Sequence, residues 1–157
     1  MKTFISTLAL AICTTNINAQ SLQHAYRDFL RVGVSVNQWQ VKAEEKVKEG
    51  ISYSGAYKTD QTADYPLIAQ HFGWVVPENC MKCEVIHPEE GVYDFTLADQ
   101  LVDKALANGQ KVIGHCLIWH SQCAPWFFTD DNGNQVSADV LRTRIKDHSY
   151  TIVSHFR

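Results

Sequence analysis

The sequence predicts an α/β fold made of parallel strand–helix units. Short apolar strands alternate three times with amphipathic helices along the 157 residues, and this alternation is typical of βαβ units with right-handed crossovers. The third predicted strand is a run of apolar residues rather than a strict alternation, as in strands buried on both faces of a parallel sheet. Hydrophobic residues make up 45% of the chain and charged residues 20%, the proportions of an ordinary globular domain.

The composition also excludes several classes of protein. With 8 glycines, 4 prolines and no repeated segment, the chain is not a fibrous, coiled-coil or largely disordered protein. Its formal charge of -3 supplies no basic surface that would neutralise phosphates. We therefore expect neither a nucleic-acid partner nor binding to an anionic membrane.

Residues 1–19 have the layout of a secretory signal peptide. Lys2 gives a positive start, residues 4–13 are mostly apolar, and the small residue Ala19 precedes the expected cut. The apolar run is about half the ~20 residues that a membrane-spanning helix needs. We expect residues 20–157 to be the mature chain, secreted or periplasmic and not held in a membrane once the signal is removed.

The first strand–helix unit begins after this segment. Apolar residues at helical spacing behind Ser21, a suitable helix cap, predict a short amphipathic helix over residues 21–31. Residues 32–36 (Val-Gly-Val-Ser-Val) then read as a strand. The polar stretch 38–64 is predicted to be a long loop containing at most one helical turn.

The second unit is shorter. Pro66 is suited to the first turn of a helix, which is predicted to run to about His71. Residues 73–76 (Gly-Trp-Val-Val) form the second predicted strand, and Pro77 closes it.

The next helix is predicted to begin at Thr96, which with Asp99 resembles a capping box, and to stop at Asn108-Gly109. Its inward face is expected to contain Leu97, Ala98, Leu101, Val102, Ala105 and Leu106. Residues 112–118 are predicted to form the third strand.

Residues 130–134 (Asp-Asp-Asn-Gly-Asn) indicate a turn before the last helix. Ser137 is its expected N-cap. Its apolar face is predicted to consist of Val140, Leu141, Ile145, Ile152, Val153 and Phe156.

Two segments that follow strands combine polar side chains with apolar and aromatic ones. They are residues 77–84 and 114–126. In parallel α/β folds the functional groups gather at the carboxyl ends of the strands. A sugar site needs this mixture, because the ring CH groups stack on tryptophan while the hydroxyls pair with amide, ammonium and carboxylate groups.

The motifs in these segments resemble those of family 10 glycoside hydrolases, the endo-β-1,4-xylanases. They are residues 78–82 (Glu-Asn-Cys-Met-Lys), 87–95 (His-Pro-Glu-Glu-Gly-Val-Tyr-Asp-Phe), Ala98-Asp99 and 114–122 (Gly-His-x-Leu-x-Trp-His-Ser-Gln). The match runs in order from about residue 24 to Arg157. The resemblance implies a (β/α)₈ TIM barrel, of which this chain holds the first three βα units, so that residues 20–157 are the amino-terminal part of the catalytic domain.

The same resemblance implies the activity and the ligands. It implies hydrolysis of β-1,4-xylosidic bonds in xylan with retention of configuration, no required cofactor and no metal, and xylan or xylo-oligosaccharides as partners. Glu78, Asn79, Lys82 and Gln122 resemble residues that hydrogen-bond the sugar one step from the cleavage point. His115 and Trp119 resemble residues that line the cleavage subsite. His120 matches the motif near the site, with direct substrate contact left open, and Trp74 and Trp126 are assigned to packing.

Neither catalytic residue is identified in this chain. Retaining hydrolysis needs two carboxyl groups about 5–5.5 Å apart, and in the family these are the glutamate of an Asn-Glu pair ending the fourth strand and a glutamate ending the seventh. The sequence stops before a fourth strand, and Glu78-Asn79 has the reverse order. The acids Glu84, Glu89, Glu90 and Asp94 are interpreted as loop residues. We expect no xylanase turnover from these 157 residues alone.

Four cysteines follow the signal segment: Cys80, Cys83, Cys116 and Cys123. They allow three fully paired connectivities, among which the sequence does not choose. Cys83 stands where the family usually has a large residue, often Trp, and Cys116 where Thr is usual.

Two alternatives to a xylanase remain. A metal or redox protein could use Cys80-x-x-Cys83 together with His115, Cys116, His120 and Cys123. The spacing between Cys116 and Cys123 is not that of a zinc knuckle. Cys80 and Cys83 are predicted to lie in a polar loop, whereas a redox dithiol lies at the start of a helix. The other alternative is a non-catalytic fragment that binds xylan.

Overall fold

The computed structural model describes residues 21–41 and 62–157. The predicted signal peptide, residues 1–19, and most of the predicted loop 38–64 lie outside the described residues. Within the described part of the chain, no helix has the length and apolar character needed to cross a membrane.

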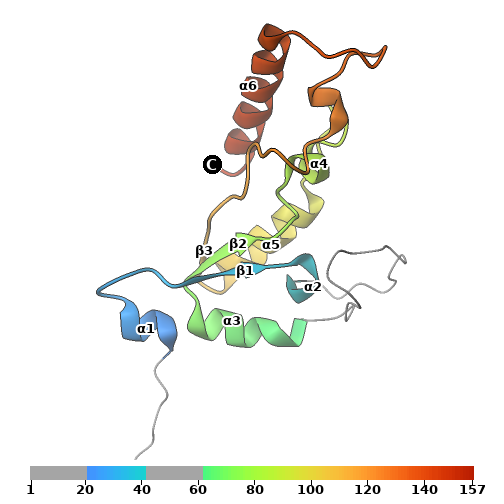
Figure 1. The fold of residues 1–157 in the computed structure, drawn as a ribbon. Coiled ribbons are helices and arrows are strands. Elements are labelled where there is room, and N and C mark those ends of the chain that lie inside the picture. The colour runs from blue at the N-terminus through green and yellow to red at the C-terminus, as the bar shows by residue number, and fades with distance from the viewer. Residues whose placement is uncertain (1–20, 42–61) are drawn as a thin grey trace, which may run out of the picture.

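The fold is built on one parallel sheet of three strands in the order β1-β2-β3. These are β1 (Gly33–Val36), β2 (Trp74–Pro77) and β3 (Lys111–Val112). Val34 pairs with Val75, and Val75 with Val112. The alternation of strands and helices predicted from the sequence is therefore confirmed, and the strands point their carboxyl ends to the same edge. Figure 1 shows the chain leaving β3 toward α4 and α6, at the opposite end of the molecule from α1.

The first helix is shorter than predicted. α1 spans Leu22–Tyr26, and the Ser21 hydroxyl accepts from the His24 amide, so the predicted cap is confirmed. The helix does not continue to residue 31. None of its residues is buried, and a short helix without a buried apolar face lacks the interactions that would extend it.

Two short helical segments border the undescribed residues. α2 (Gln38–Val41) supplies the helical turn predicted after the first strand, and the Asn37 side chain accepts from the Gln40 amide at 3.1 Å. The 3₁₀ turn η1 (Thr62–Asp64) leads directly into α3 (Tyr65–His71). Pro66 lies in the first turn of α3 and the helix ends at His71, as predicted.

Residues 83–86 correct the prediction of a polar loop. They form α4 (Cys83–Ile86), in which the Lys82 carbonyl accepts from the amides of Val85 and Ile86. Both Cys83 and Ile86 are buried. The sequence reads as polar because of Lys82 and Glu84, but the turn is stabilised by the two apolar side chains that it places inward.

α5 (Thr96–Ala107) ends before Asn108-Gly109, as predicted. Its capping differs from the prediction: Thr96 is the first helical residue, and the Asp94 carboxylate accepts from its amide at 2.9 Å. Ala98, Leu101 and Ala105 are fully buried, as expected. Leu106 is 60% exposed, so its prediction as an inward residue is wrong.

The third strand is much shorter than the predicted range 112–118. The Ile113 amide still donates to the Val75 carbonyl, but beyond this point the chain leaves the sheet. Ile113 is 49% exposed, and Leu117 and Ile118 are exposed as well. In the described part of the chain β3 is an edge strand, so nothing on its outer side covers the apolar run or continues the ladder.

The last helix is α6 (Ala138–His155), preceded by the 3₁₀ turn η2 (Pro125–Phe127). The Ser137 hydroxyl accepts from the Val140 amide, which confirms the predicted cap. The predicted turn at 130–134 is confirmed by the hydrogen bond from the Asp130 amide to the Asn134 carbonyl. Ile152 is buried. Val140 and Val153 are exposed, which corrects their assignment to the inner face.

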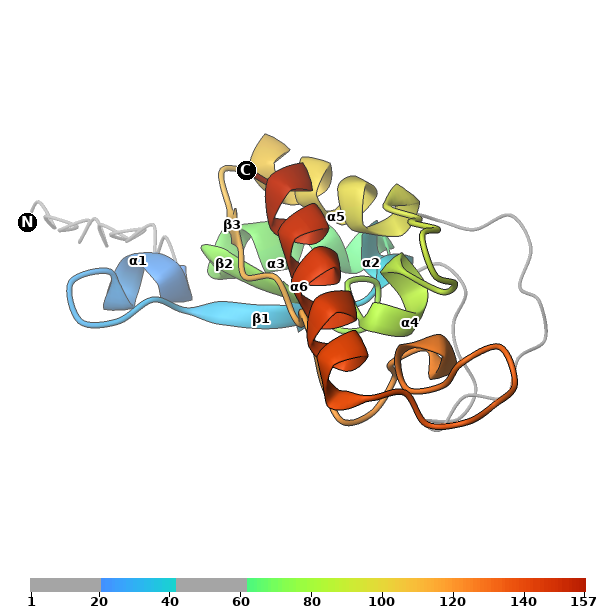
Figure 2. The ribbon, with the colours of Figure 1, turned by 90° about the horizontal axis from the view of Figure 1, so that it is seen from above.

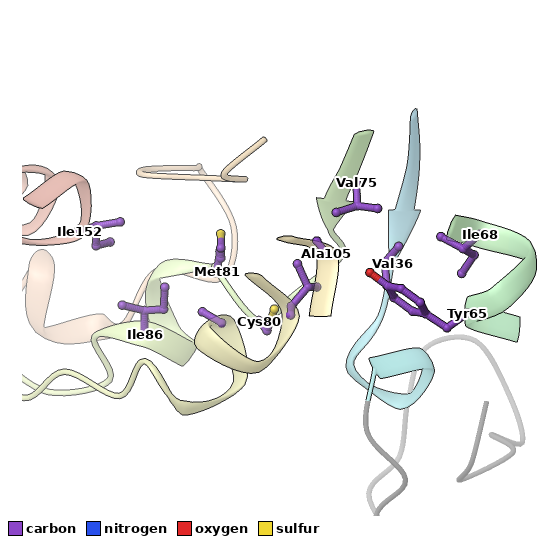
Figure 3. Packing of buried hydrophobic residues seen from close by; sticks show 11 residues of the cluster. Val36, Tyr65, Ile68, Val75, Cys80, Met81, Ile86, Ala105 and Ile152 are labelled. Carbon is purple, nitrogen blue, oxygen red and sulfur yellow. The ribbon is translucent and has the colours of Figure 1, made fainter. Parts of the chain in front are cut away.

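The main core lies between the sheet and its helices (Figure 3). Val36 and Val75 contribute from the strands, Leu101 from α5, and Tyr65 from α3, where its hydroxyl donates to Gln110 Oε1 at 2.9 Å. Figure 2, seen from above, shows α6 crossing in front of the strands, α3 lying behind them and α5 running along one side. A second cluster of buried residues contains Cys83, Ala124 and Phe127.

Candidate functional site

The candidate site is centred on Lys82, which lies in the turn after β2. Its side chain is held between two amides: the Nζ atom donates to Asn79 Oδ1 at 2.7 Å and to Gln122 Oε1. Lys82 is only 8% exposed. A buried ammonium requires such acceptors, because its charge loses the hydration it has in water. Lys82 therefore joins the segment after β2 to the segment after β3.

Backbone contacts hold these two segments in the same relative position. The Lys82 amide donates to the Asn79 carbonyl at 2.9 Å, which forms a tight turn. The Glu84 amide donates to the Gln122 carbonyl at 3.0 Å, which joins the turn to the second segment. Gln122 has a φ of 54°, in the left-handed region that non-glycine residues rarely adopt. This conformation is maintained by the contacts that its carbonyl and side chain make with residues 82–84.

The aromatic part of the site is Trp119. The Lys82 Nζ atom lies 4.8 Å from the centroid of its ring, a distance typical of a cation–π contact. The Cys123 thiol donates to the Trp119 carbonyl at 3.0 Å and fixes the backbone. The indole is 37% exposed, so part of its surface is open to solvent.

The three remaining predicted residues lie around this centre. Glu78 follows β2, where its amide donates to the Val36 carbonyl, and its side chain is exposed. The rings of His115 and His120 lie 6.3 and 4.9 Å from the Trp119 ring, centroid to centroid. His115 also lines an apolar pocket of about 450 Å³ between β3, α5 and α6. The structure thus brings Asn79, Trp119 and Gln122 into contact with Lys82, with His115 and His120 against the indole. In the described part of the chain Glu78 has no side-chain hydrogen bond to this cluster.

Behind the site lies a buried histidine pair that the sequence did not reveal. His148, on α6, has its Nε2 atom 2.8 Å from the Leu117 carbonyl, so this nitrogen carries a proton and donates it. Its Nδ1 atom lies 3.0 Å from Nδ1 of His87, which must then be the donor. The Gly91 amide donates to the remaining nitrogen of His87. This network assigns both rings to the neutral form.

Burial is the main reason that these histidines remain neutral. Desolvation, with a smaller effect of the neighbouring His148, lowers the pKa of His87 to about 4. Burial likewise lowers the pKa of His148, against the opposing effect of its hydrogen bond to Leu117. The pair anchors Leu117, two residues from Trp119, to α6. Only the occurrence of His87 within the 87–95 motif could have marked it in the sequence.

A second long-range contact fixes the loop after α4. Arg144 on α6 forms two hydrogen bonds to the Glu90 carboxylate, at 3.0 and 2.8 Å, and one to the Thr129 carbonyl at 3.0 Å. The Trp126 indole NH donates to the His87 carbonyl at 3.1 Å, in agreement with its assignment to packing. Glu90 therefore has a structural partner that the interpretation as a simple loop acid did not anticipate.

The cysteine and histidine residues of the alternative metal site do not come together. Within residues 21–41 and 62–157, no three His, Cys, Asp or Glu side chains are grouped so that they could hold a metal ion. Cys80 belongs to the main core, Cys83 to the second cluster, and His115 and His120 to the exposed surface beside Trp119.

The fold and site define a class: parallel βα units with a polar and aromatic cluster at the carboxyl ends of the strands, where α/β proteins place their functional groups. Comparison with known families agrees, because the model of glycosyl hydrolase family 10 matches residues 21–157. The chain belongs to this family, and the resemblance noted in its motifs is confirmed.

Two relatives come from Xylanibacter ruminicola. An endo-1,4-beta-xylanase/feruloyl esterase is 35% identical over 136 residues, which is 87% of this chain and 16% of that protein. Endo-1,4-beta-xylanase A is 48% identical over 90 residues, 57% of this chain and 24% of that protein. This chain thus spans less than a quarter of the length of either relative.

Solved structures show the same fold. Xylanase XynB from Paenibacillus barcinonensis aligns with a TM-score of 0.73 and 30% identity, over 90% of this chain and 37% of that one. An intracellular xylanase of Thermoanaerobacterium saccharolyticum, in complex with xylotetraose, aligns with a TM-score of 0.72 and 32% identity, over 88% of this chain and 38% of that one. These neighbours are TIM barrels, and the unclosed three-stranded sheet is part of such a barrel, as predicted.

Proposed function

We propose that this chain carries part of the xylan-binding cleft of a secreted, retaining endo-1,4-β-xylanase. The observation that carries the proposal is the buried Lys82 ammonium, which holds the amides of Asn79 and Gln122 beside the face of Trp119. Membership of glycosyl hydrolase family 10 supports xylan as the polysaccharide, as does the xylotetraose bound by one structural neighbour.

The hydrogen bonds to Lys82 determine what the two amides offer a sugar. Lysine can only donate, so the amide oxygens of Asn79 and Gln122 must face it. Their NH₂ groups then remain to donate to sugar hydroxyls. Both amides are fixed before the ligand arrives, so little side-chain entropy is lost on binding.

The surrounding residues add an acceptor and an apolar face. In this proposal the exposed carboxylate of Glu78 accepts hydrogen bonds from two neighbouring hydroxyls, a pattern that carboxylates suit well. The half-exposed indole of Trp119 stacks on a xylose ring, and His115, beside it, donates to or accepts from a hydroxyl. His120, on another side of the indole, is assigned to positioning Trp119.

Hydrolysis is assigned to the whole enzyme and not to these 157 residues. Retaining hydrolysis needs an acid/base and a nucleophile about 5–5.5 Å apart. Glu78 belongs to the binding motif, Glu90 pairs with Arg144, and Asp94 caps α5. We propose that the chain alone binds xylo-oligosaccharides and releases no reducing sugar from xylan. Clear hydrolysis by the purified 157-residue product would contradict this.

Export is a separate part of the proposal and has its own test. Residues 1–19 are proposed to be removed on secretion, so the mature protein would begin at Gln20. Amino-terminal sequencing of the exported protein decides this, and a mature chain that retains Met1 would overturn it.

Calorimetric titration with xylotetraose tests the binding site. Lys82→Ala removes the donor that orients both amides, and we expect at least a tenfold loss of affinity. Lys146→Ala is the matched control, because Lys146 lies exposed on α6, in a different part of the fold from the site. Circular dichroism of both variants verifies that they are folded. Equal affinity of a folded Lys82→Ala variant and the unchanged chain would refute the proposed site.

A further inference from the structure

Two cysteines occupy the positions directly after the central pair of the site. Cys83 follows Lys82 and Cys123 follows Gln122 in the sequence. Their side chains lie in one buried cluster. The Cys123 thiol donates to the Trp119 carbonyl at 3.0 Å, and the Cys83 sulfur lies 3.5 Å from Nε2 of His148. The sequence left the pairing of the four cysteines open, and the fold brings these two together.

A backbone hydrogen bond places the two cysteines on neighbouring segments. The Glu84 amide donates to the Gln122 carbonyl at 3.0 Å. The Cα atoms of Cys83 and Cys123 belong to the two peptide units that this bond joins. A disulfide needs its Cα atoms about 4.4–6.8 Å apart, a range typical of residues on hydrogen-bonded neighbouring segments. Both side chains also pack in the same cluster with Ala124 and Phe127.

We propose that Cys83 and Cys123 are a redox pair that closes into a disulfide, linking α4 to the segment after β3. The oxidant is a small-molecule disulfide. The Cys123 thiolate attacks one sulfur of the reagent, the S–S bond of the reagent breaks, and the first thiol leaves with the proton released by Cys123. The Cys83 thiolate then attacks the Cys123 sulfur of the mixed disulfide, and the second thiol leaves with the proton of Cys83. The protein loses two hydrogens, and the reagent is reduced to two thiols.

The order of these steps follows from burial. Cys83 is 2% exposed, and burial together with the neighbouring thiols raises its pKa well above the ordinary value. Cys123 is only partly buried and can meet a reagent from solvent. The more accessible thiol attacks first, and the buried thiol reacts once the mixed disulfide is next to it.

The other two cysteines are less suited to the reaction. Cys80 is buried in the main core, and burial raises its pKa to about 11. Burial, with a smaller effect of the neighbouring Cys123, raises the pKa of Cys116. By contrast, Cys83 and Cys123 pack in the same cluster and flank a shared backbone hydrogen bond. A Cys116–Cys123 disulfide is therefore the competing product that an experiment must distinguish.

Closing this pair would restrain the site. The new bond would hold Lys82 and Gln122 at their hydrogen-bonding distance even when the surrounding chain moves. The disulfide itself depends only on the geometry above, whereas an effect on sugar binding also rests on the proposed function.

Peptide mapping tests the disulfide directly. The protein is incubated with oxidised glutathione under native conditions, free thiols are alkylated, and the product is digested with trypsin. Cleavage after Lys82 places Cys80 and Cys83 in different peptides, 59–82 and 83–104, and Cys123 lies in 112–142. A second digestion with chymotrypsin, after Trp119, separates Cys116 from Cys123.

We expect peptide 83–104 to be linked to the fragment that contains Cys123, with a mass two hydrogens lower than the separate peptides, and the link to disappear on reduction. Cys116→Ser should retain it and Cys123→Ser should abolish it. Oxidation should also raise the Tm by about 5–10 °C, and not in the folded Cys123→Ser variant. Alkylation of both Cys83 and Cys123 after oxidation, or a link through Cys80 or Cys116, would overturn the proposal.

Xylotetraose titration of the oxidised and reduced forms separates this inference from the proposed function. If both the disulfide and the sugar-binding site exist as proposed, the oxidised form should bind xylotetraose more tightly. A mapped Cys83–Cys123 disulfide in a protein that binds no xylotetraose would leave the redox pair standing and refute the sugar site.

Discussion

The rings of His87 and His148 lie stacked with their centroids 5.2 Å apart and their Nδ1 atoms at 3.0 Å, although 61 residues separate them in the sequence. One Nδ1 must donate to the other, so this contact exists only while the accepting ring is unprotonated at that atom. Through the Leu117 carbonyl, the same pair positions the segment that carries Trp119. The stability of the fold and the shape of the candidate site are therefore linked through these two histidines.

The stability of the chain is expected to fall between pH 6.5 and pH 4. The pKa of His87 is lowered from 6.5 to about 4 in the folded chain, so in this range the unfolded chain binds more protons. Its contribution is present above pH 6.5 and is lost as the pH falls, with a slope of at most about 1.4 kcal/mol per pH unit. Urea unfolding at pH 7 and pH 5 measures this slope.

The variant His87→Gln should reduce that slope, whereas the exposed His120→Gln should leave it unchanged. The same pH dependence in the unchanged chain and in His87→Gln would contradict the role given to the histidine pair.

Truncation of the core at Leu101 should destabilise the chain strongly. Leu101 is fully buried on α5, and Leu106 on the same helix is 60% exposed. We expect Leu101→Ala to lower the free energy of unfolding by about 2–5 kcal/mol, because it removes apolar contacts and leaves a cavity. Leu106→Ala is the matched control and should cost less than about 0.5 kcal/mol. Urea denaturation of both variants is the measurement, and equal losses would mean that the core is not packed as described.

The cap of α5 should depend on the carboxylate of Asp94. The Asp94 carboxylate accepts from the Thr96 backbone amide and side chain, and these hydrogen bonds lower its pKa. Asp94→Ala is expected to destabilise the chain by about 0.5–2 kcal/mol. Asp103→Ala, which removes an exposed acid from the middle of the same helix, is the control. A larger loss of stability from Asp103→Ala would show that the negative charge of the helix, and not the cap, determines the stability.

Removal of the Trp119 indole should weaken sugar binding without unfolding the chain. Stacking of an aromatic ring contributes about 0.5–1.5 kcal/mol, so Trp119→Ala should reduce the affinity for xylotetraose by about 2- to 13-fold. Trp74, in β2, is assigned to packing, and Trp74→Phe should leave the affinity unchanged. Calorimetric titration of both variants gives the comparison, and an unaltered affinity in Trp119→Ala would remove the indole from the site.

The predictions that succeeded depend on short stretches of sequence. Ser21 and Ser137 cap the helices that directly follow them, and Pro66 lies at the start of its helix. The motif residues Asn79, Lys82, Trp119 and Gln122 come together because each follows a strand of the same parallel sheet. A cap, a helical repeat and the end of a strand each involve residues within a few positions, so their pattern can be read directly.

The predictions that failed depend on what covers a residue. The run 112–118 has the composition of a doubly buried strand, but β3 ends at Val112 and Ile113 is half exposed. Leu106 and Val153 fit the helical repeat of an inner face and are nevertheless exposed. Periodicity gives the face on which a side chain lies, but not whether another element packs on that face.

The sequence by itself determined the alternation of strands and helices, the family and the types of residue at the candidate site, because these are carried by local patterns and short motifs. Only the tertiary structure decided that His87 meets His148, that Arg144 meets Glu90, and that Cys83 and Cys123 pack in one cluster. Each of these pairs joins segments far apart in the chain, and their contact depends on how the segments after the strands pack against α4 and α6.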